Sequence, residues 1–207
     1  MVRNAAVILA GLALIPLCTG CRVRTEKGVN GEDKSVQVDT PFGGVHVNTN
    51  DTTAVDLGLP AYPGAEVAKD DDKHQSADVH MGFGEWQLRV RAVSYSSTDP
   101  QDKVAAFYKK AMARFGDVLT CQGNAPVGTP TVTAEGLDCA DSGKSAHINI
   151  NGKGNGVDFS GELQLKAGSK RHQHIVGFEE PKNGKTRFAL VAIDLPAGVE
   201  SEGDKSD

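Results

Sequence analysis

Two histidines, His172 and His174, have the spacing in this chain that most directly suggests metal chemistry. Residues two apart in a strand share a face, so both imidazoles would point the same way. Zinc needs three or four ligands, and the nearby Glu179 and Glu180 lie beyond an apolar stretch that separates them from the pair. The pattern therefore indicates two histidines on the wet face of a strand, and we assign the sequence no metal site and no cofactor.

A second candidate lies in an acidic segment, where Asp70, Asp72 and His74 alternate like the first ligands of a calcium loop. Such a loop needs glycine at its sixth position and a bidentate glutamate at its twelfth. Gln75 and Met81 stand there instead. The segment is therefore expected to be a solvated loop, and no catalytic residue is assigned anywhere in the chain.

Cysteine chemistry is the stronger signal, because the four cysteines divide into two pairs of different meaning. Cys18 and Cys21 close an apolar N-terminal segment, whereas Cys121 and Cys139 lie in the body of the chain. In an oxidising compartment, two such cysteines most simply form a disulfide. We expect a disulfide between Cys121 and Cys139; the alternative is two buried free thiols.

The N-terminal segment has the features of a secretory signal peptide. Arg3 supplies a positive start, residues 5–17 are apolar, and the small residues Thr19 and Gly20 follow. This order is typical of an exported protein. A transmembrane helix needs about 20 apolar residues, and the polar residues from Arg22 onward prevent such an extension.

The run Leu17-Cys18-Thr19-Gly20-Cys21 resembles the lipobox of bacterial lipoproteins, although Cys18 occupies the place of the usual leucine. The resemblance implies that Cys21 becomes the first residue and carries a thioether-linked diacylglycerol and an N-acyl chain such as palmitate. Two or more chains give stable anchoring. In a Gram-negative host, Arg22 after the cysteine implies the periplasmic face of the outer membrane.

The amino-acid composition narrows the class of protein further. The hydrophobic fraction is 39% and the charged fraction 24%, which is typical of a globular domain. The net charge is −5 and no run of lysine and arginine occurs. Nucleic-acid binding is excluded, because it depends on neutralising phosphates.

The pattern along the chain predicts an α+β fold, with a mostly antiparallel sheet and one main helix at about residues 100–115 packed on one face. Asp99 is expected to cap this helix, Pro100 to begin it and Gly116 to end it in the left-handed conformation. Alternation between residues 35 and 48 predicts a hairpin, either an accessory arm or an edge of the main sheet. Alternation also places Trp86 on the apolar side of a strand.

Later strands are expected at 118–121, 131–134, 146–151, 157–166, 172–178 and 187–195. Asn183-Gly184 is a hairpin turn signal between the last two. The expected organisation is a signal peptide (1–20), a flexible tether (22–35) within a segment that carries the hairpin (21–56), the α+β domain (57–197) and a disordered acidic tail (198–207).

A second resemblance rests on Tyr62-Pro63-Gly64-Ala65 and on Phe107-Tyr108, which follow a capped helix start at Ser97-Thr98-Asp99. Over residues 59–121 this is similar to a pattern in uncharacterised bacterial secreted and lipoprotein domains. It implies a small α+β domain and no activity.

The resulting hypothesis is a membrane-anchored envelope lipoprotein that serves as a binding or interaction module. Its partners would be the membrane, through lipid on Cys21, and an envelope protein or a small apolar ligand between helix and sheet. The alternative is a periplasmic hydrolase that uses His147, His172 or His174 with a carboxylate distant in sequence.

Overall fold

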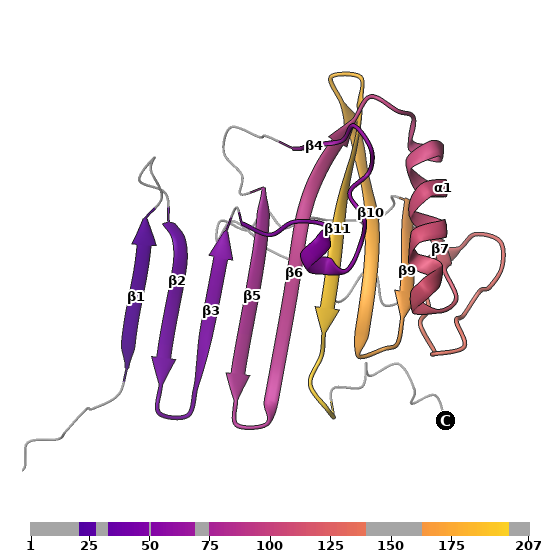
Figure 1. The fold of residues 1–207 in the computed structure, drawn as a ribbon. Helices are drawn as coiled ribbons and strands as arrows, with labels where there is room; N and C mark the ends of the chain where they lie inside the picture. The colour runs from indigo at the N-terminus through magenta and orange to yellow at the C-terminus, as the bar shows by residue number, and fades with distance from the viewer. Residues whose placement is uncertain (1–20, 28–32, 50, 69–74, 140–162, 199–207) are drawn as a thin grey trace, which may run out of the picture.

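A computed structural model describes residues 21–27, 33–49, 51–68, 75–139 and 163–198 (Figure 1). The expected signal peptide, the acidic segment with Asp70, Asp72 and His74, and the tail from 199 lie outside these residues. So do His147, the expected strand at 146–151 and the first part of that at 157–166.

One antiparallel sheet dominates the described chain, in the order β1-β2-β3-β5-β6-β11-β10-β9-β7-β8, with β4 paired to β6. The strands are β1 (Arg22–Lys27), β2 (Asp33–Thr40), β3 (Gly43–Thr49), β4 (Glu66–Val67), β5 (Ser76–Phe83), β6 (Trp86–Ser97), β7 (Leu119–Gln122), β8 (Ala125–Pro126), β9 (Leu163–Gly168), β10 (His172–Lys182) and β11 (Lys185–Asp194). The sheet is open, and α1 (Gln101–Met112) is the α-helix of the described residues. The expected sheet-dominant α+β class is confirmed.

The predicted N-terminal hairpin is an edge of the main sheet rather than a separate arm. β2 pairs with β3 across a tight turn at Pro41-Phe42, and β3 pairs in turn with β5. The expectation of a flexible tether at 22–35 is wrong for Arg22–Lys27, which forms β1 against β2. Its charged residues alternate with Val23 and Thr25, so one side of this strand continues the less polar face of the hairpin.

The helix forms where its apolar spacing predicts, with Val104, Tyr108 and Met112 buried along one side. Its start differs by one residue, because Pro100 is the N-cap and no side chain caps the helix. The Asp99 carboxylate instead accepts a hydrogen bond from the Tyr62 hydroxyl at 2.7 Å.

After α1 the chain makes a 3-10 turn, η2 (Ala113–Phe115), and leaves it at Gly116. The φ of +119° and ψ of −155° at Gly116 lie outside the predicted left-handed helical region, although they still favour glycine.

The C-terminal half follows the sequence prediction closely in one place and departs from it in another. Asn183 and Gly184 both have positive φ, 55° and 71°, and turn β10 into β11 as predicted. The strand expected at 131–134 is absent from the structure, where these residues form a loop. Thr133 turns its hydroxyl to accept a hydrogen bond from the Leu137 N–H at 2.9 Å, so local bonding replaces strand pairing there.

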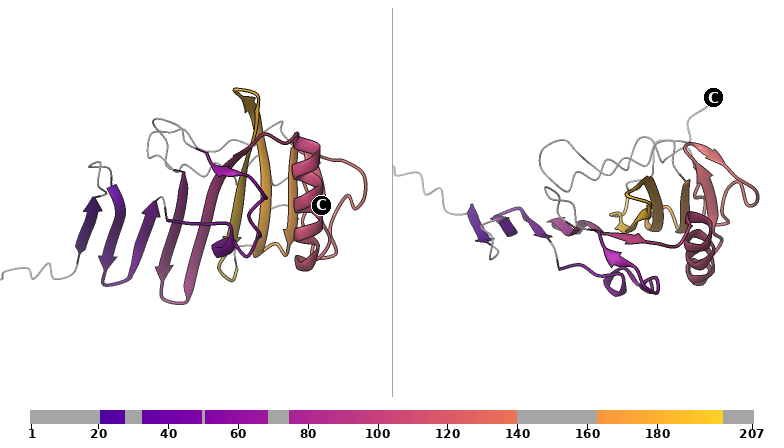
Figure 2. Two further views of the ribbon diagram at one scale, coloured as in Figure 1. Left: turned by 45° about the horizontal axis from the view of Figure 1, so that its top comes forward. Right: turned by 90° about the horizontal axis from the view of Figure 1, so that it is seen from above.

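The core lies between α1 and the C-terminal half of the sheet. Aromatic rings fill its centre, with Phe188 contacting the rings of Tyr62, Tyr95, Tyr108 and Phe178. Seen from above, α1 and the segment with η1 (Val55–Leu57) lie on the same side of the sheet (Figure 2). We call this side the front face; β1, β2 and β3 extend beyond the helix as a single layer.

Candidate functional site

The front face carries a network of charged side chains where the single-layer part of the sheet meets the core. Arg91 of β6 lies at its centre, and its guanidinium donates to the carboxylate of Asp194 at 3.1 Å and to the main-chain carbonyl of Asp56. The imidazole Nδ1 of His172 lies 2.9 Å from the other carboxylate oxygen of Asp194. The network therefore ties η1 to three neighbouring strands, β6, β11 and β10.

A second pair adjoins this network one strand away. Arg89 contacts Asp78 through two guanidinium nitrogens, Nε at 3.0 Å and Nη2 at 2.5 Å. A shallow hollow of about 480 Å³ lies beside both arginines. Its lining residues are Asn48, Asp51, Thr52, Asp56, Asp78, Arg89 and Arg91.

The surroundings of three groups in this region favour their charged forms. The bond to Asp78 raises the pKa of Arg89, and the hydrogen bonds from Thr53 lower the pKa of Asp56. Burial alone would raise the pKa of Asp194, but the hydrogen bond from His172 and the charge of Arg91 together lower it. Both carboxylates are thus stabilised as anions, Asp56 by Thr53 and Asp194 by His172 and Arg91, which is the behaviour of a structural network.

The two histidines singled out in the sequence share the front face, as their spacing predicts. The expectation that both face water holds for His172 and is wrong for His174, which is half-buried. The ring of His174 stacks on Phe115, with centroids 3.7 Å apart, and Arg114 lies over the same Phe115 ring at 4.7 Å. Burial lowers the pKa of His174, partly opposed by a hydrogen bond with the Leu57 backbone. His172 instead is exposed and holds Asp194. The two imidazoles do not form a joint site.

The chemistry open to these groups is limited. His172 and Asp194 form the base-and-orienter part of a hydrolytic triad, but no serine or cysteine side chain hydrogen bonds to the His172 ring in the described part of the chain. A second histidine pair, His46 and His80, lies on adjacent strands with ring centroids 6.5 Å apart. Within the described ranges, no group of three or more His, Cys, Asp or Glu residues is arranged to hold a metal.

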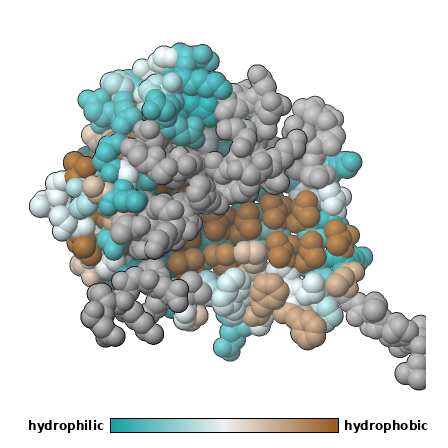
Figure 3. Space-filling view, turned by 180° about the vertical axis from the view of Figure 1, so that it is seen from behind, coloured by the Kyte–Doolittle hydropathy of each residue, from teal (hydrophilic) through white to brown (hydrophobic). Residues whose placement is uncertain are grey.

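The opposite, rear face has the reverse character. Side chains that pair across antiparallel strands share a face, and the apolar residues of β2, β3, β5 and β6 pair with one another throughout. Two hydrophobic rows result and are visible in Figure 3. The rows are Val38, Val45, Met81 and Leu88, and Val36, Val47, Val79 and Val90. Val90 packs against the buried rear cluster that contains Ile193, so the second row continues into it.

The cysteines are placed as follows. Cys121 of β7 and Cys139 lie at disulfide distance, with sulfur atoms 2.00 Å apart, and both are buried beside Leu119. Cys21 is exposed, carries a free thiol and directly precedes β1. Trp86 lies half-buried on the rear side of β6, next to Phe83, so its expected place on the apolar side is confirmed.

One further functional candidate, not predicted from the sequence, has a signal that is visible there. Phe42 occupies the tip of the β2–β3 turn and is 85% exposed. Turn positions usually carry polar residues or glycine and proline, so an exposed phenylalanine there is a candidate contact residue. The partners of Arg91, by contrast, are far apart in the chain and leave no local pattern.

No helix in the described ranges has the length and hydrophobicity needed to cross a membrane. Comparisons of the chain with protein-family models, curated proteins and solved structures found no match.

Proposed function

We propose that the chain is exported, acylated on Cys21 and held in the cell envelope, where it serves as a binding module rather than an enzyme. The signal-peptide pattern and the lipobox resemblance support the anchor. The exposed position of Cys21 immediately ahead of β1 is compatible with it, because a lipid there would not disturb the core. In a Gram-negative host the site would be the periplasmic face of the outer membrane.

The single observation that carries a binding role is the apolar rear face over β2, β3, β5 and β6. These strands have a polar front and a hydrophobic rear, and an apolar sheet face is stable only when another layer covers it. The space between α1 and the sheet is filled by Phe188 and its aromatic neighbours, so the rear face is the better place for a partner. Its extent over four neighbouring strands favours an envelope protein over a small apolar ligand.

The anchor is tested by metabolic labelling with a fatty-acid probe in a bacterial host. Wild-type protein should take up the label, and Cys21→Ser should not. Uptake by the Cys21→Ser variant would contradict the anchor.

The rear face is tested by photo-crosslinking from two adjacent positions on β3. A crosslinker at position 47 faces the rear, and one at position 46 faces the front. A defined adduct with one envelope protein is expected from position 47 alone. Equal crosslinking from both positions, or none from position 47, would contradict a binding role for this face.

The hydrolase alternative rests on the 2.9 Å contact between His172 and Asp194. It predicts that His172→Ala abolishes an esterase or amidase activity of the purified protein. The binding role predicts that wild type has no such activity in the same screen.

A further inference from the structure

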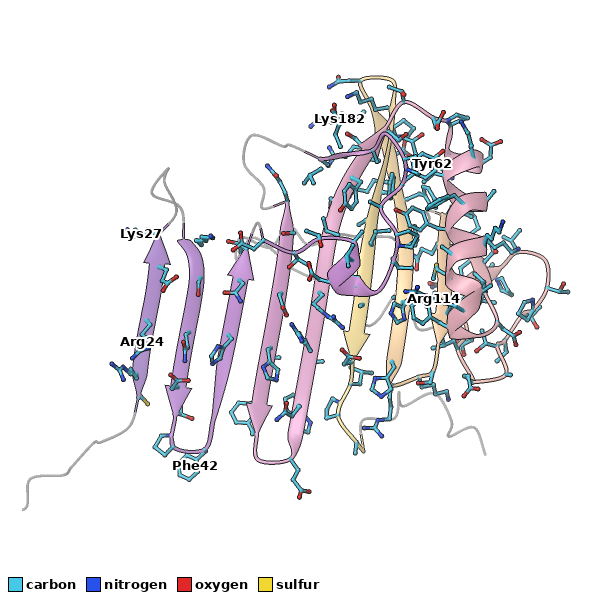
Figure 4. The ribbon with its side chains drawn as sticks, in the orientation of Figure 1. Arg24, Lys27, Phe42, Tyr62, Arg114 and Lys182 are labelled. Atoms are coloured by element: carbon cyan, nitrogen blue, oxygen red, sulfur yellow. A yellow bond between two sulfur atoms is a disulfide. The ribbon has the colours of Figure 1, made fainter. Side chains whose placement is uncertain are left out.

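The register of the sheet brings Cys21 and three aromatic residues to one end of the molecule. Arg22 pairs with Asp39, and the same row continues through Gly44 and Gly82 to Gln87. The next row outward therefore holds Cys21, Thr40, Gly43, Phe83 and Trp86. Phe42 lies one position further out, at the tip of the β2–β3 turn (Figure 4).

The aromatic side chains of this end are presented to the outside. Phe42 is 85% exposed and Phe83 is 48% exposed, although aromatic residues normally bury most of their surface. Phe83 lies against Trp86 with ring centroids 5.9 Å apart. Gly43 has no side chain, and a Cβ there would lie 2.0 Å from the Gly82 carbonyl oxygen and 2.5 Å from the Phe83 ring. We call Phe42, Phe83 and Trp86 the aromatic edge.

The chain enters this edge from a segment suited to lipid. Residues 5–17 are apolar and end four positions before Cys21. Under the proposed function, acyl chains on Cys21 enter the bilayer at this row. If the apolar segment were retained instead, it would also bring the bilayer to within a few residues of the same row.

The geometry points to a lipid bilayer as the partner of this edge: we propose that the aromatic edge inserts into the headgroup region of the membrane that holds the chain. Tryptophan prefers that depth, and phenylalanine is common on the buried side of interfacial segments. A strand rises about 3.3 Å per residue, so the outermost row and the turn reach the 5–10 Å depth typical of interfacial groups. The proposal deepens the proposed function and rests on its membrane anchor.

Charge and direction favour this partner over the alternatives. Arg22, Asp39 and Glu85 are the charged residues nearest the edge and sum to a net charge of −1, so contact with lipid would rest on the aromatic rings and would gain nothing from anionic lipid. Phe42 lies beyond the end of the strands rather than over the rear face (Figure 4). A second copy covering the rear face would leave this ring in water, whereas a bilayer meeting the end of the sheet would bury it.

Trp86 is the one tryptophan of the chain, so its fluorescence reports on the edge itself. The full chain, extracted from host membranes, is reconstituted into vesicles of phosphatidylcholine with and without lipids brominated near the headgroup. We expect brominated lipid to quench the fluorescence of Trp86. The extent of quenching should be similar when phosphatidylglycerol is added or when 0.5 M salt is present, because salt at that concentration screens electrostatic attraction to the membrane surface.

Two matched variants test the role of the turn. Phe42→Ser removes a ring that the fold does not bury. We expect it to lower the ratio of molecules with the aromatic edge inserted to molecules with it withdrawn roughly tenfold. Val132→Ser removes a 53% exposed apolar side chain elsewhere and should leave quenching unchanged.

Three results would overturn the proposal. Trp86 could show no quenching by brominated lipid and full access to acrylamide. It could be unquenched by lipid yet shielded from acrylamide, with crosslinked dimers present, in which case a second copy covers the edge. Lastly, brominated lipid could quench Trp86 to the same extent in Phe42→Ser and Val132→Ser.

The anchor is scored separately, from the mass of the peptide that contains Cys21. Quenching without acylation would uphold the edge and reject the proposed anchor, and acylation without quenching would do the reverse.

Discussion

Reduction of the disulfide between Cys121 and Cys139 is expected to remove a large part of the stability of this domain. The bond closes a loop with a sequence separation of 18 between β7 and the region before β9. Both cysteines are buried, and reduction removes the crosslink while adding only two hydrogen atoms. The folded loop also has contacts of its own, including the Ala134 N–H to Asp117 at 3.1 Å and the Lys166 ammonium to the Asp138 carbonyl at 3.1 Å.

The magnitude follows from the loop length. In the chain-entropy model, opening a loop of this size in the unfolded chain lowers the free energy of unfolding by about 3 kcal/mol. For a domain of this size the dependence on urea is about 2 kcal/mol per molar, so the midpoint should fall by about 1.5 M. Replacing both cysteines by alanine should cost more, because a buried cavity is added.

The assay is urea unfolding of oxidised and reduced wild-type protein, followed by far-ultraviolet circular dichroism and by Trp86 fluorescence. Cys21→Ser, which changes the exposed thiol, is the matched control and should show the same difference between its oxidised and reduced forms. Midpoints that agree within about 0.3 M would refute the reasoning. Such agreement would mean that the crosslink restricts the unfolded chain far less than its length implies.

Two further perturbations probe the core and the half-buried histidine, His174. Phe188→Ala, at a fully buried site, should lower the free energy of unfolding by about 3–5 kcal/mol. Phe42→Ala, at an exposed site, should change it by less than about 0.5 kcal/mol. Equal losses for the two variants in chemical denaturation would contradict the assigned core. Burial lowers the pKa of His174 below the ordinary histidine value of 6.5. Below that pH the unfolded chain therefore binds more protons than the folded chain. The contribution of His174 to stability should be complete above pH 6.5 and fall from there toward pH 5. His174→Gln should flatten this slope in a pH series of thermal melts, and an unchanged slope would assign the effect to another group. The lowered pKa of Asp194 acts in a separate window, with stability present above pH 3.8 and lost as the pH falls further.

Elements specified by neighbours in sequence were predictable. The helix around Tyr108 and the turn at Asn183-Gly184 depend on local spacing and on backbone conformations that particular residues favour. The strand at Arg22–Lys27 was missed because charged residues hide its alternation, and its pairing with β2 decides its structure. The strand expected at 131–134 was overpredicted, because β-branched residues favour strands only where a neighbouring strand accepts them.

The candidate sites divide in the same way. Cys21, Cys121 and Cys139 are conspicuous by residue type, and the placement of the latter two at bonding distance is in keeping with the sequence. Arg91 and Asp194 are 103 positions apart and meet because β6 and β11 are neighbours, which no local pattern indicates. The rear face was foreseeable strand by strand, but its continuity needed the register.

The extension of the sheet beyond α1 has a consequence for how the molecule comes apart. β11 and β6 are flanked on both sides and rest on the aromatic core, whereas β1 depends on β2, β2 on β3, and β3 on β5. Strands paired in such a series separate from the outermost strand, β1, inward, and the central strands open only when the whole domain unfolds. A partner bound to the rear face, as proposed, would therefore also stabilise these outer strands, and its departure would free the end of the sheet that bears Cys21.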